Sequence, residues 1–170
     1  MGNLWQRMVR AARLDVRLYE EVEHDPAATQ QSVLVVVLSS LASGIGSLQY
    51  GILGLLGIAL GALVGWFIWA AIVYLIGAKL LPQETTEADL GQLLRTIGFS
   101  ASPGVIRVLG VIPGLGGIIN FIAAIWMLVA MVAAVRQALD YSSTARAVLV
   151  CVVGWFVYLL LAIVLGISAL

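Results

Sequence analysis

Long apolar segments dominate this chain and restrict what it can fold into more than any single motif does. Five of them, separated by short polar stretches, lie at about residues 30–48, 53–81, 90–112, 115–135 and 147–167. A helix needs about 20 apolar residues to cross the hydrocarbon core of a bilayer. Of the 170 residues, 62% are hydrophobic and 11% are charged, whereas about a quarter are charged in soluble domains. The sequence therefore predicts an all-α, polytopic membrane protein with five transmembrane helices.

Residues 1–25 form the one long polar stretch and are predicted to be a separate cytoplasmic segment, an amphipathic helix followed by an acidic turn. Apolar residues recur on one face of this helix: Leu4, Trp5, Met8, Ala12, Val16 and Tyr19. Arginines occupy another face: Arg7, Arg10, Arg13 and Arg17. A helix of this kind lies in the interface of a membrane. We expect Arg10, Arg13 and Arg17 to contact lipid headgroups or other anions.

The acidic turn contains Glu20, Glu21, Glu23 and Asp25 around the single histidine, His24. One histidine without cysteine or a second spaced histidine is weak evidence for a metal site. The turn is interpreted either as a solvated or headgroup-facing segment or as a docking surface for a basic cytosolic partner. Residues 26–170 are assigned to the five-span transmembrane domain.

Small residues recur every four positions in the first two apolar segments. The first segment carries Ser39, Ser43 and Ser47, and the second carries Gly57, Gly61 and Gly65. Small residues at this spacing let two helix backbones approach closely in a membrane. We expect the two segments to pack as a tight hairpin through residues 49–51, and packing between two chains is the alternative.

The third apolar segment is predicted to begin at a capping box formed by Thr86 and Asp89, and it contains a predicted kink. Proline removes one backbone hydrogen bond and obstructs another, so Pro103 and Gly104 should weaken the helix, while the hydroxyls of Ser100 and Ser102 can satisfy freed carbonyls. The kink is either a static feature, a hinge or the unwound site of a transporter. Downstream, Arg107 lies deep in apolar sequence, where it either contacts a lipid headgroup or anion or snorkels to the membrane surface.

The basic residues predict the orientation of the chain, because Lys and Arg favour cytoplasmic loops. With the N-terminus inside and five crossings, every Lys and Arg except Arg107 falls on the cytoplasmic side. If the third segment re-entered without crossing, Arg136 and Arg146 would move outside. The charges therefore favour five crossings of the inner membrane of a prokaryotic cell, with the C-terminus external.

Residues 97–103 (IGFSASP) place a glycine-aromatic pair shortly before a proline, and this pattern resembles the YIP family of five-span membrane proteins. A second match, to the prokaryotic branch, runs through residues 125–128, 135–138 and 145–147 (IWML, VRQA and ARA). Eukaryotic relatives bind Rab GTPases and act in vesicle traffic. Their N-terminal aspartate-leucine-tyrosine-glycine-proline motif is replaced here by LYEEV at residues 18–22. The resemblance therefore implies a fold and a membrane role, but not Rab binding.

Several classes of function are disfavoured by what the sequence lacks. The net charge is zero and the basic residues form no single patch, which excludes a nucleic-acid partner. No catalytic triad, metal motif or phosphate loop is found, so we expect no enzyme activity, no metal and no cofactor. The leading hypothesis is a non-enzymatic organiser or scaffold that binds lipids and other membrane proteins, or itself as a homo-oligomer. A transporter or channel that uses the kinked third segment, and an accessory subunit of an energy-transducing complex, are the alternatives.

The four tryptophans within predicted spans bear on the last alternative. Trp66, Trp69, Trp126 and Trp155 lie inside the apolar segments rather than at their ends. Each indole N–H needs a partner when it is buried. The partner is either a neighbouring helix or a bound molecule.

Overall fold

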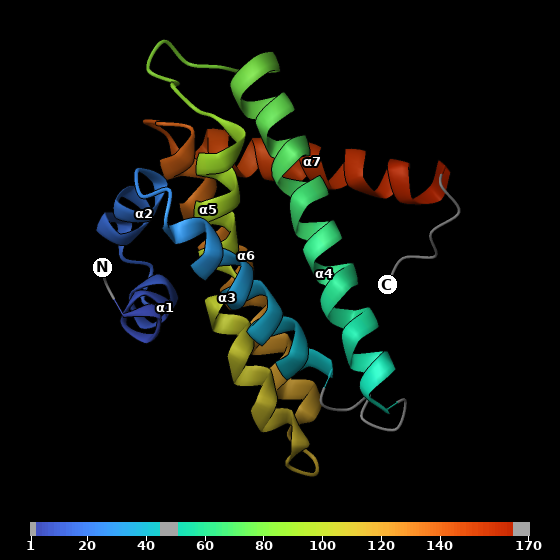
Figure 1. Ribbon diagram of the computed structural model, residues 1–170. Helices are drawn as coiled ribbons and strands as arrows, with labels where there is room; N and C mark the ends of the chain where they lie inside the picture. Colours follow the sequence, from blue (N-terminus) through green and yellow to red (C-terminus); the bar gives the residue numbers. More distant parts are fainter. Residues whose placement is uncertain (1–2, 45–50, 165–170) are drawn as a thin grey trace.

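The computed structural model describes residues 3–44 and 51–164, and these residues form helices joined by short loops (Figure 1). Two of the helical segments depart from α-helical geometry: η2 is a π-helical continuation of α4, and η3 is a 3-10 helix that follows α5. The elements in chain order are α1 (Leu4–Ala12), α2 (Val16–Glu23), α3 (Ala28–Ser43), α4 (Gly51–Tyr74), η2 (Leu75–Leu80), α5 (Leu90–Ser100), η3 (Ser102–Val111), α6 (Gly116–Ala138) and α7 (Thr144–Val164).

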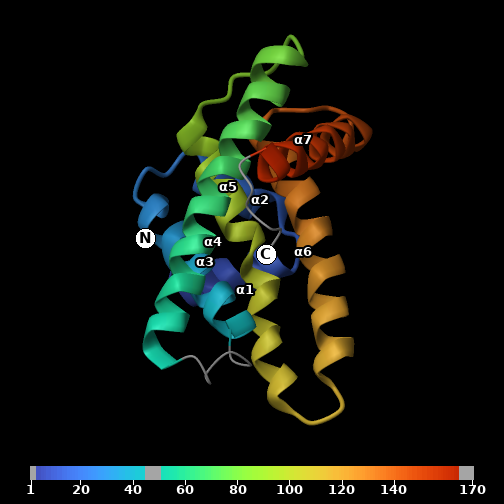
Figure 2. The same cartoon turned by 90° about the vertical axis from the view of Figure 1, so that its right-hand side faces the viewer.

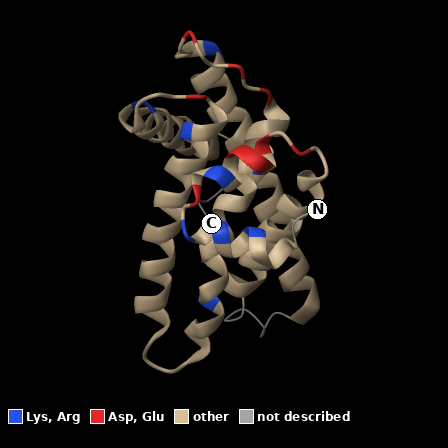
Figure 3. Ribbon diagram, turned by 90° about the vertical axis from the view of Figure 1, so that its left-hand side faces the viewer, with Lys and Arg blue, Asp and Glu red and all other residues tan. Residues whose placement is uncertain are grey.

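The helices α3, α5, η3 and α6 pack side by side, and α4 leans against α3 and α5 (Figures 1 and 2). Helix α7 runs across α4 and α6 instead of lying parallel to them. The short helices α1 and α2 dock on the opposite side of the bundle from α4. Charged residues gather at the end of the bundle that carries α2 and the loop before α5 (Figure 3). The other end of the bundle carries few charges.

Helix length and composition place this chain among membrane proteins. Three helical stretches among the described residues are long and apolar enough to cross a bilayer: Gly51–Leu80, Gly116–Ala138 and Thr144–Val164. A shorter apolar helix, α3, precedes them. The third apolar segment is helical along its length but changes type, because α5 gives way to η3. The predicted ends of the first and last spans, at residues 48 and 167, lie outside the described residues.

The N-terminal segment differs from its prediction in two ways. It forms two helices instead of one, because Leu14 adopts a left-handed backbone with φ 61° and Asp15 caps the start of α2 by accepting a hydrogen bond from the amide of Arg17. Part of its predicted apolar face, including Met8 and Tyr19, is also buried against the bundle, while Trp5 and Val16 are exposed. Leu18 and Tyr19 are fully buried in a core that includes Phe99 of α5. The two helices therefore form a hairpin that covers the bundle.

Two loop features explain how the third segment is positioned. Helix α5 begins with a capping box in which the side chains of Asp89 and Gln92 each accept from the other's backbone amide. Thr86 does not share in this cap as predicted, because its hydroxyl donates to the carbonyl of Leu139 instead. Between η3 and α6, Gly114 has φ 84°, a left-handed conformation that favours glycine. The segment therefore ends in a tight turn into α6.

Candidate functional site

The N-terminal hairpin, α1 and α2, is held together by ion pairs around a buried arginine. Arg7 is only 4% exposed, and its guanidinium donates to Glu21 Oε1 at 2.8 Å and to Asp25 Oδ2 at 2.9 Å. Its Nε also donates to Glu21 Oε1 at 3.0 Å, and a bond from Nη1 to Gln31 Oε1 at 3.0 Å joins the hairpin to α3. Hydrogen bonds from Arg10 and Arg7 hold the pKa of the Glu21 carboxyl below its usual range, and the bond from Arg7 does the same for the pKa of Asp25. The acidic turn is thus largely satisfied within the chain.

The three arginines expected to contact lipid do not share one environment. Arg10 pairs with Asp15 at 2.8 Å and with Glu21 at 2.7 Å, so its charge is compensated within the hairpin. Arg13 and Arg17 are exposed. Trp5 and Val16 of the same hairpin are also exposed. A lipid contact stays a prediction, now centred on Arg13 and Arg17.

Two side chains of the bundle clamp the ends of the hairpin helices. Arg95 of α5 donates from Nε to the carbonyls of Val22 and Glu23 at 3.0 Å each, and from Nη2 to the carbonyl of Glu23. Trp126 of α6 donates from its indole nitrogen to the carbonyl of Ala12 at 2.7 Å. The last carbonyls of a helix have no partner within the helix and carry partial negative charge. The clamps supply the missing donors and fix the hairpin to the bundle.

Glu23 is the least compensated charge in the hairpin. It is 1% exposed, and its Oε2 atom has no hydrogen-bond partner among the described residues. The pKa of Glu23 is raised to about 7, chiefly by burial. The nearby Asp140 and Glu20 carboxylates contribute to this rise in pKa, whereas His24 and Arg95 oppose it. Gln137 of α6 donates to the neighbouring Glu20. The Glu23 carboxyl is therefore poised to titrate near neutral pH at the junction of α2 with the bundle.

Close packing of small residues joins α3 to the third segment, and we call this contact the central seam. A Cβ added at Gly98 would lie 2.6 Å from Ser32 Cβ, and one added at Gly104 would lie 2.0 Å from Ser39 Oγ and 2.8 Å from Met127 Sδ. Only glycine permits such an approach. The hydroxyl of Ser32 also donates to the carbonyl of Arg95 at 3.2 Å. The seam therefore interlocks α3, α5, η3 and α6.

The predicted kink lies in the middle of the central seam. The helix changes from α to 3-10 geometry at this point, because Pro103 has no amide hydrogen to donate to the carbonyl of Phe99. The hydroxyl of Ser102 donates to that carbonyl at 2.7 Å, and the hydroxyl of Ser100 donates to the carbonyl of Ile97 at 2.6 Å. Both serines, Pro103 and Gly104 are buried. The serines thus do what the sequence predicted for them, which is to occupy carbonyls beside the break.

Arg107 is held at the end of the central seam away from the hairpin. Its Nη1 donates to Ser43 Oγ at 3.0 Å, and its Nε is buried without a partner among the described residues. Among the ion pairs of residues 3–44 and 51–164, none includes Arg107. The structure thus ties this arginine to α3, while contact with a lipid headgroup or another anion stays a prediction.

Helices α3 and α4 do pack against each other, but the prediction that they do so through the serine and glycine faces is wrong for all three glycines. A Cβ added at Gly57 or Gly61 would meet no atom within 4 Å, and at Gly65 it would meet only the hydroxyl of Tyr158, at 3.7 Å. Ser39 of α3 packs on Gly104 instead. Ser47 lies outside the described residues. Gly57 and Gly61 of α4 therefore do not pack against any other described helix of the chain.

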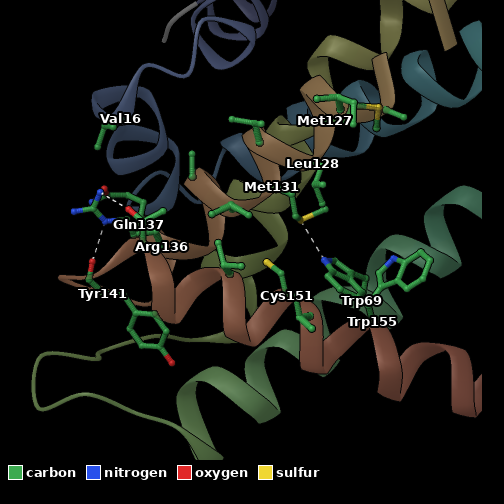
Figure 4. A pocket seen from close by; sticks show the side chains of 18 of the residues that line it. Val16, Trp69, Met127, Leu128, Met131, Arg136, Gln137, Tyr141, Cys151 and Trp155 are labelled. Carbon is green, nitrogen blue, oxygen red and sulfur yellow. Dashed lines mark hydrogen bonds between the residues drawn. The ribbon is translucent and has the colours of Figure 1, made fainter. Parts of the chain in front are cut away.

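A cleft of about 1450 Å³ lies between α6 and α7, and Figure 4 shows its walls. Trp69 of α4 reaches between the two helices: its indole nitrogen donates to Met131 Sδ at 3.2 Å, and its ring packs on Gly154 and edge-on against Tyr158. Trp66 has a helix partner as well, the carbonyl of Leu94 at 3.2 Å. Trp155 lines the cleft and is 61% exposed.

The sequence interpretation missed the residues that build the hairpin contacts. The sequence predicts Arg7 on the arginine face of an interfacial helix, Arg95 among the cytoplasmic basic residues and Glu23 in the acidic turn, and it indicates no contact among them. One signal was present: Asp15, a good N-cap residue, precedes the apolar Val16 and marks a helix start inside the presumed single helix. With two helices, the basic one and the acidic one face each other, so their ion pairs follow.

One comparison with known protein families gives a match, and it spans most of the helices described above. The family model of the Yip1 domain matches residues 19–166. No curated protein and no solved structure matches the chain. The matched region begins at Tyr19 in α2 and contains the central seam, the open glycine face and the cleft. Helix α1 lies outside it.

Proposed function

The chain belongs to the Yip1 domain family, as residues 97–103 predicted, and from this premise we propose that it is a non-enzymatic organiser of membrane proteins and lipids. Family membership and the apolar helices place it in the membrane as a multi-pass protein. We propose that it binds transmembrane helices of other proteins or of a second copy of this chain. The proposed role needs neither a cofactor nor a metal.

The open face of α4 is the observation that carries the proposal. A Cβ at Gly57 or Gly61 would meet nothing within the described part of the chain. Four large apolar residues near these glycines are exposed: Leu53, Leu56, Leu60 and Val64. In a membrane, small residues at this spacing are used for close helix packing. A face of this kind suits a helix of another chain.

The proposed topology has five crossings with the N-terminus cytoplasmic. The third segment is long enough, since 11 α-helical residues and 10 residues of 3-10 helix together rise about 36 Å, against a core about 30 Å thick. The fifth crossing requires α7 to tilt toward the direction of α6. The 21 residues of α7 rise about 32 Å, which is long enough to cross the hydrocarbon core. An epitope after residue 170 should then be accessible only from outside the cell, and a cytoplasmic epitope would remove the fifth crossing.

The dense packing at the kink favours an organiser over a transporter. Gly104 is pressed between Ser39 and Met127, and the serines at the break are bonded to the backbone of their own helix. A transport path would need space and unpaired polar groups at this place.

Co-purification from gently solubilised membranes tests the proposal. The native chain should bring down other membrane proteins or a second copy at a reproducible ratio, and the double variant Gly57→Leu, Gly61→Leu should lose them. The control variant Ile163→Leu changes an exposed apolar position of α7 and should leave the ratio unchanged. Solute flux through proteoliposomes that contain this chain alone would overturn the proposal.

A further inference from the structure

The cleft between α6 and α7 is polar at the end where the two helices join and mainly apolar along the rest of its length, where the one charged lining residue is Arg107 of η3. The polar lining at this junction consists of Arg136, Gln137, Asp140, Tyr141, Ser142 and Thr144. Further along, apolar residues of α6 face those of α7, among them Leu128, Val132, Val152 and Phe156. Figure 4 shows the same separation, with Arg136 and Gln137 at one end and Trp69 and Trp155 at the other. An occupant must therefore have a polar head and an apolar body.

The polar end presents a cation that the protein holds in place. The Arg136 guanidinium donates to the carbonyl of Tyr141, to Thr144 Oγ1 and to the carbonyl of Ser142, each at 3.2 Å. A guanidinium has five N–H donors, and these three bonds use three of them. Two N–H donors of Arg136 are therefore available to a ligand. No carboxylate pairs with Arg136 among the ion pairs of the described residues. A fixed fork of two donors suits a phosphate group.

The dimensions of the cleft fit a lipid tail. Its α6 wall runs from Ala124 to Arg136, a rise of about 18 Å. One leaflet of the hydrocarbon core, half of about 30 Å, is similar in depth. The cleft volume of about 1450 Å³ exceeds the range of about 300–1000 Å³ of ordinary small-molecule sites. Trp69 keeps the helices apart, because its indole is inserted between Met131 and Gly154.

We infer that the cleft binds one anionic phospholipid of the leaflet on the hairpin side, with its phosphate on Arg136 and its acyl chains along α6 and α7. Asp140 also lines the polar end and disfavours more than one negative charge on the headgroup. The inference deepens the proposed organiser function and rests on it for its purpose in the membrane. The binding itself depends on the cleft as the structure shows it, with α7 running across α6, and a tilt of α7 into a fifth crossing would narrow the cleft.

Native mass spectrometry of the purified full-length chain in detergent tests the inference, with phosphatidylglycerol and phosphatidylcholine of identical acyl chains as probes. Both lipids carry a phosphate, but the choline ammonium of phosphatidylcholine neutralises the headgroup and is repelled by the guanidinium of Arg136. We therefore expect one phosphatidylglycerol to bind about tenfold more tightly than phosphatidylcholine. Arg136→Gln should abolish the preference. Arg146→Gln, which removes the same charge near the start of α7 but outside the cleft lining, should leave it intact. Equal affinities for the two lipids, or a preference that survives Arg136→Gln, would overturn the inference.

A second pair of variants keeps the test decisive if Arg136→Gln is unstable. Val152→Trp adds bulk inside the cleft and should reduce the binding of phosphatidylglycerol by about fivefold or more, since a filled cleft loses its apolar contacts with the acyl chains. Leu160→Trp makes the same kind of change on an exposed part of α7 outside the cleft lining and should not reduce it. Unchanged binding in Val152→Trp would contradict the inference. Because these measurements contain no other protein, their failure leaves the co-purification test of the proposed function standing.

Discussion

Small residues occur both at the central seam and on the glycine face of α4, but only those of the seam are closely packed within the described part of the chain. At the central seam, Gly98 and Gly104 lie so close to Ser32 and Ser39 that a methyl group would collide with them. On α4, a methyl group at Gly61 would meet nothing in the described residues. Glycine therefore forms a closed contact in one region and an exposed helix face in the other.

The contrast extends to polar groups. The seam side is covered by the N-terminal hairpin, whose central arginine is paired and whose helix ends are clamped by Arg95 and Trp126. The α4 and α7 side has large exposed apolar residues and a cleft with two unused donors. We conclude that the first side holds the fold together and propose that the second side is available to lipids and other helices. The predictions below test that division.

Substitution of a seam glycine should have the largest effect. Gly104→Leu forces a side chain into Ser39 and Met127, and overpacking of this kind costs about 1–3 kcal/mol or more. Gly61→Leu should leave the thermal stability of the isolated chain unchanged or raise it, because glycine is about 1 kcal/mol less favourable than alanine in a helix. Thermal unfolding in detergent compares the two. Equal destabilisation would mean that α4 packs against the chain in a way the structure does not contain.

Removal of the Arg95 clamp should have the next largest effect. Arg95→Met leaves the carbonyls of Val22 and Glu23 without side-chain donors, at a cost of about 1–3 kcal/mol for buried groups. The expected result is faster hydrogen exchange in α1 and α2 with little change in α6. Arg17→Met is the matched control, since Arg17 is exposed. If α1 and α2 show the same hydrogen-exchange rates in both variants, the Arg95 clamp does not hold the hairpin, and its apolar core does.

Glu23 makes the seam side sensitive to pH. Its pKa is raised from 4.5 to about 7 in the folded chain, so the folded state keeps a proton that the unfolded state loses. Stability should fall as the pH rises from about 5 to about 7 and change little above that. Glu23→Gln should remove the fall and raise the unfolding temperature at alkaline pH by a few degrees, measured by thermal unfolding across a pH series.

His24 is the control for this pH dependence, because its pKa is also raised and its protonation is lost in a nearby range. The Glu23→Gln effect should persist in a His24→Gln background. An unchanged pH profile in Glu23→Gln would show that the carboxyl is already compensated by Arg95 or by water.

Charge removal at the hairpin surface should have the smallest effect. Arg13→Gln with Arg17→Gln should weaken attachment of the hairpin surface to anionic lipids by about 1 kcal/mol per charge. The measurement is the protection of α1 from protease in vesicles with and without phosphatidylglycerol. Arg10→Gln should instead loosen the hairpin in both kinds of vesicle, because Arg10 pairs with Asp15 and Glu21. Identical responses of the two variants would contradict the division between paired and exposed arginines.

The sequence was sufficient for the class of fold but not for its contacts. Apolar length predicted the long helices, and the proline with its neighbouring serines predicted the change in the third segment, because these are properties of single segments. The partner of a small-residue face is a property of two segments. Ser39 could have met Gly61 or Gly104, and only the three-dimensional arrangement decides between them.

The hairpin contacts were harder to predict for a similar reason. Arg7 and Arg10 looked like membrane anchors because their partners, Glu21 and Asp25, lie one helix later or beyond it. A residue in the left-handed conformation at Leu14, which no propensity favours, reverses the chain and brings the two helices together. The cleft likewise depends on the angle of α7, which apolar composition does not specify.

The division into a closed and an available side is tested most directly by site-specific photocrosslinking in native membranes. A photoreactive residue would be placed at Leu60 or Val64 on the open face of α4, and at Ala101 or Val105 beside the central seam. The account predicts crosslinks to another polypeptide chain from the α4 positions and only crosslinks within the chain from the seam positions. Crosslinks to other chains from the seam, with none from α4, would contradict it.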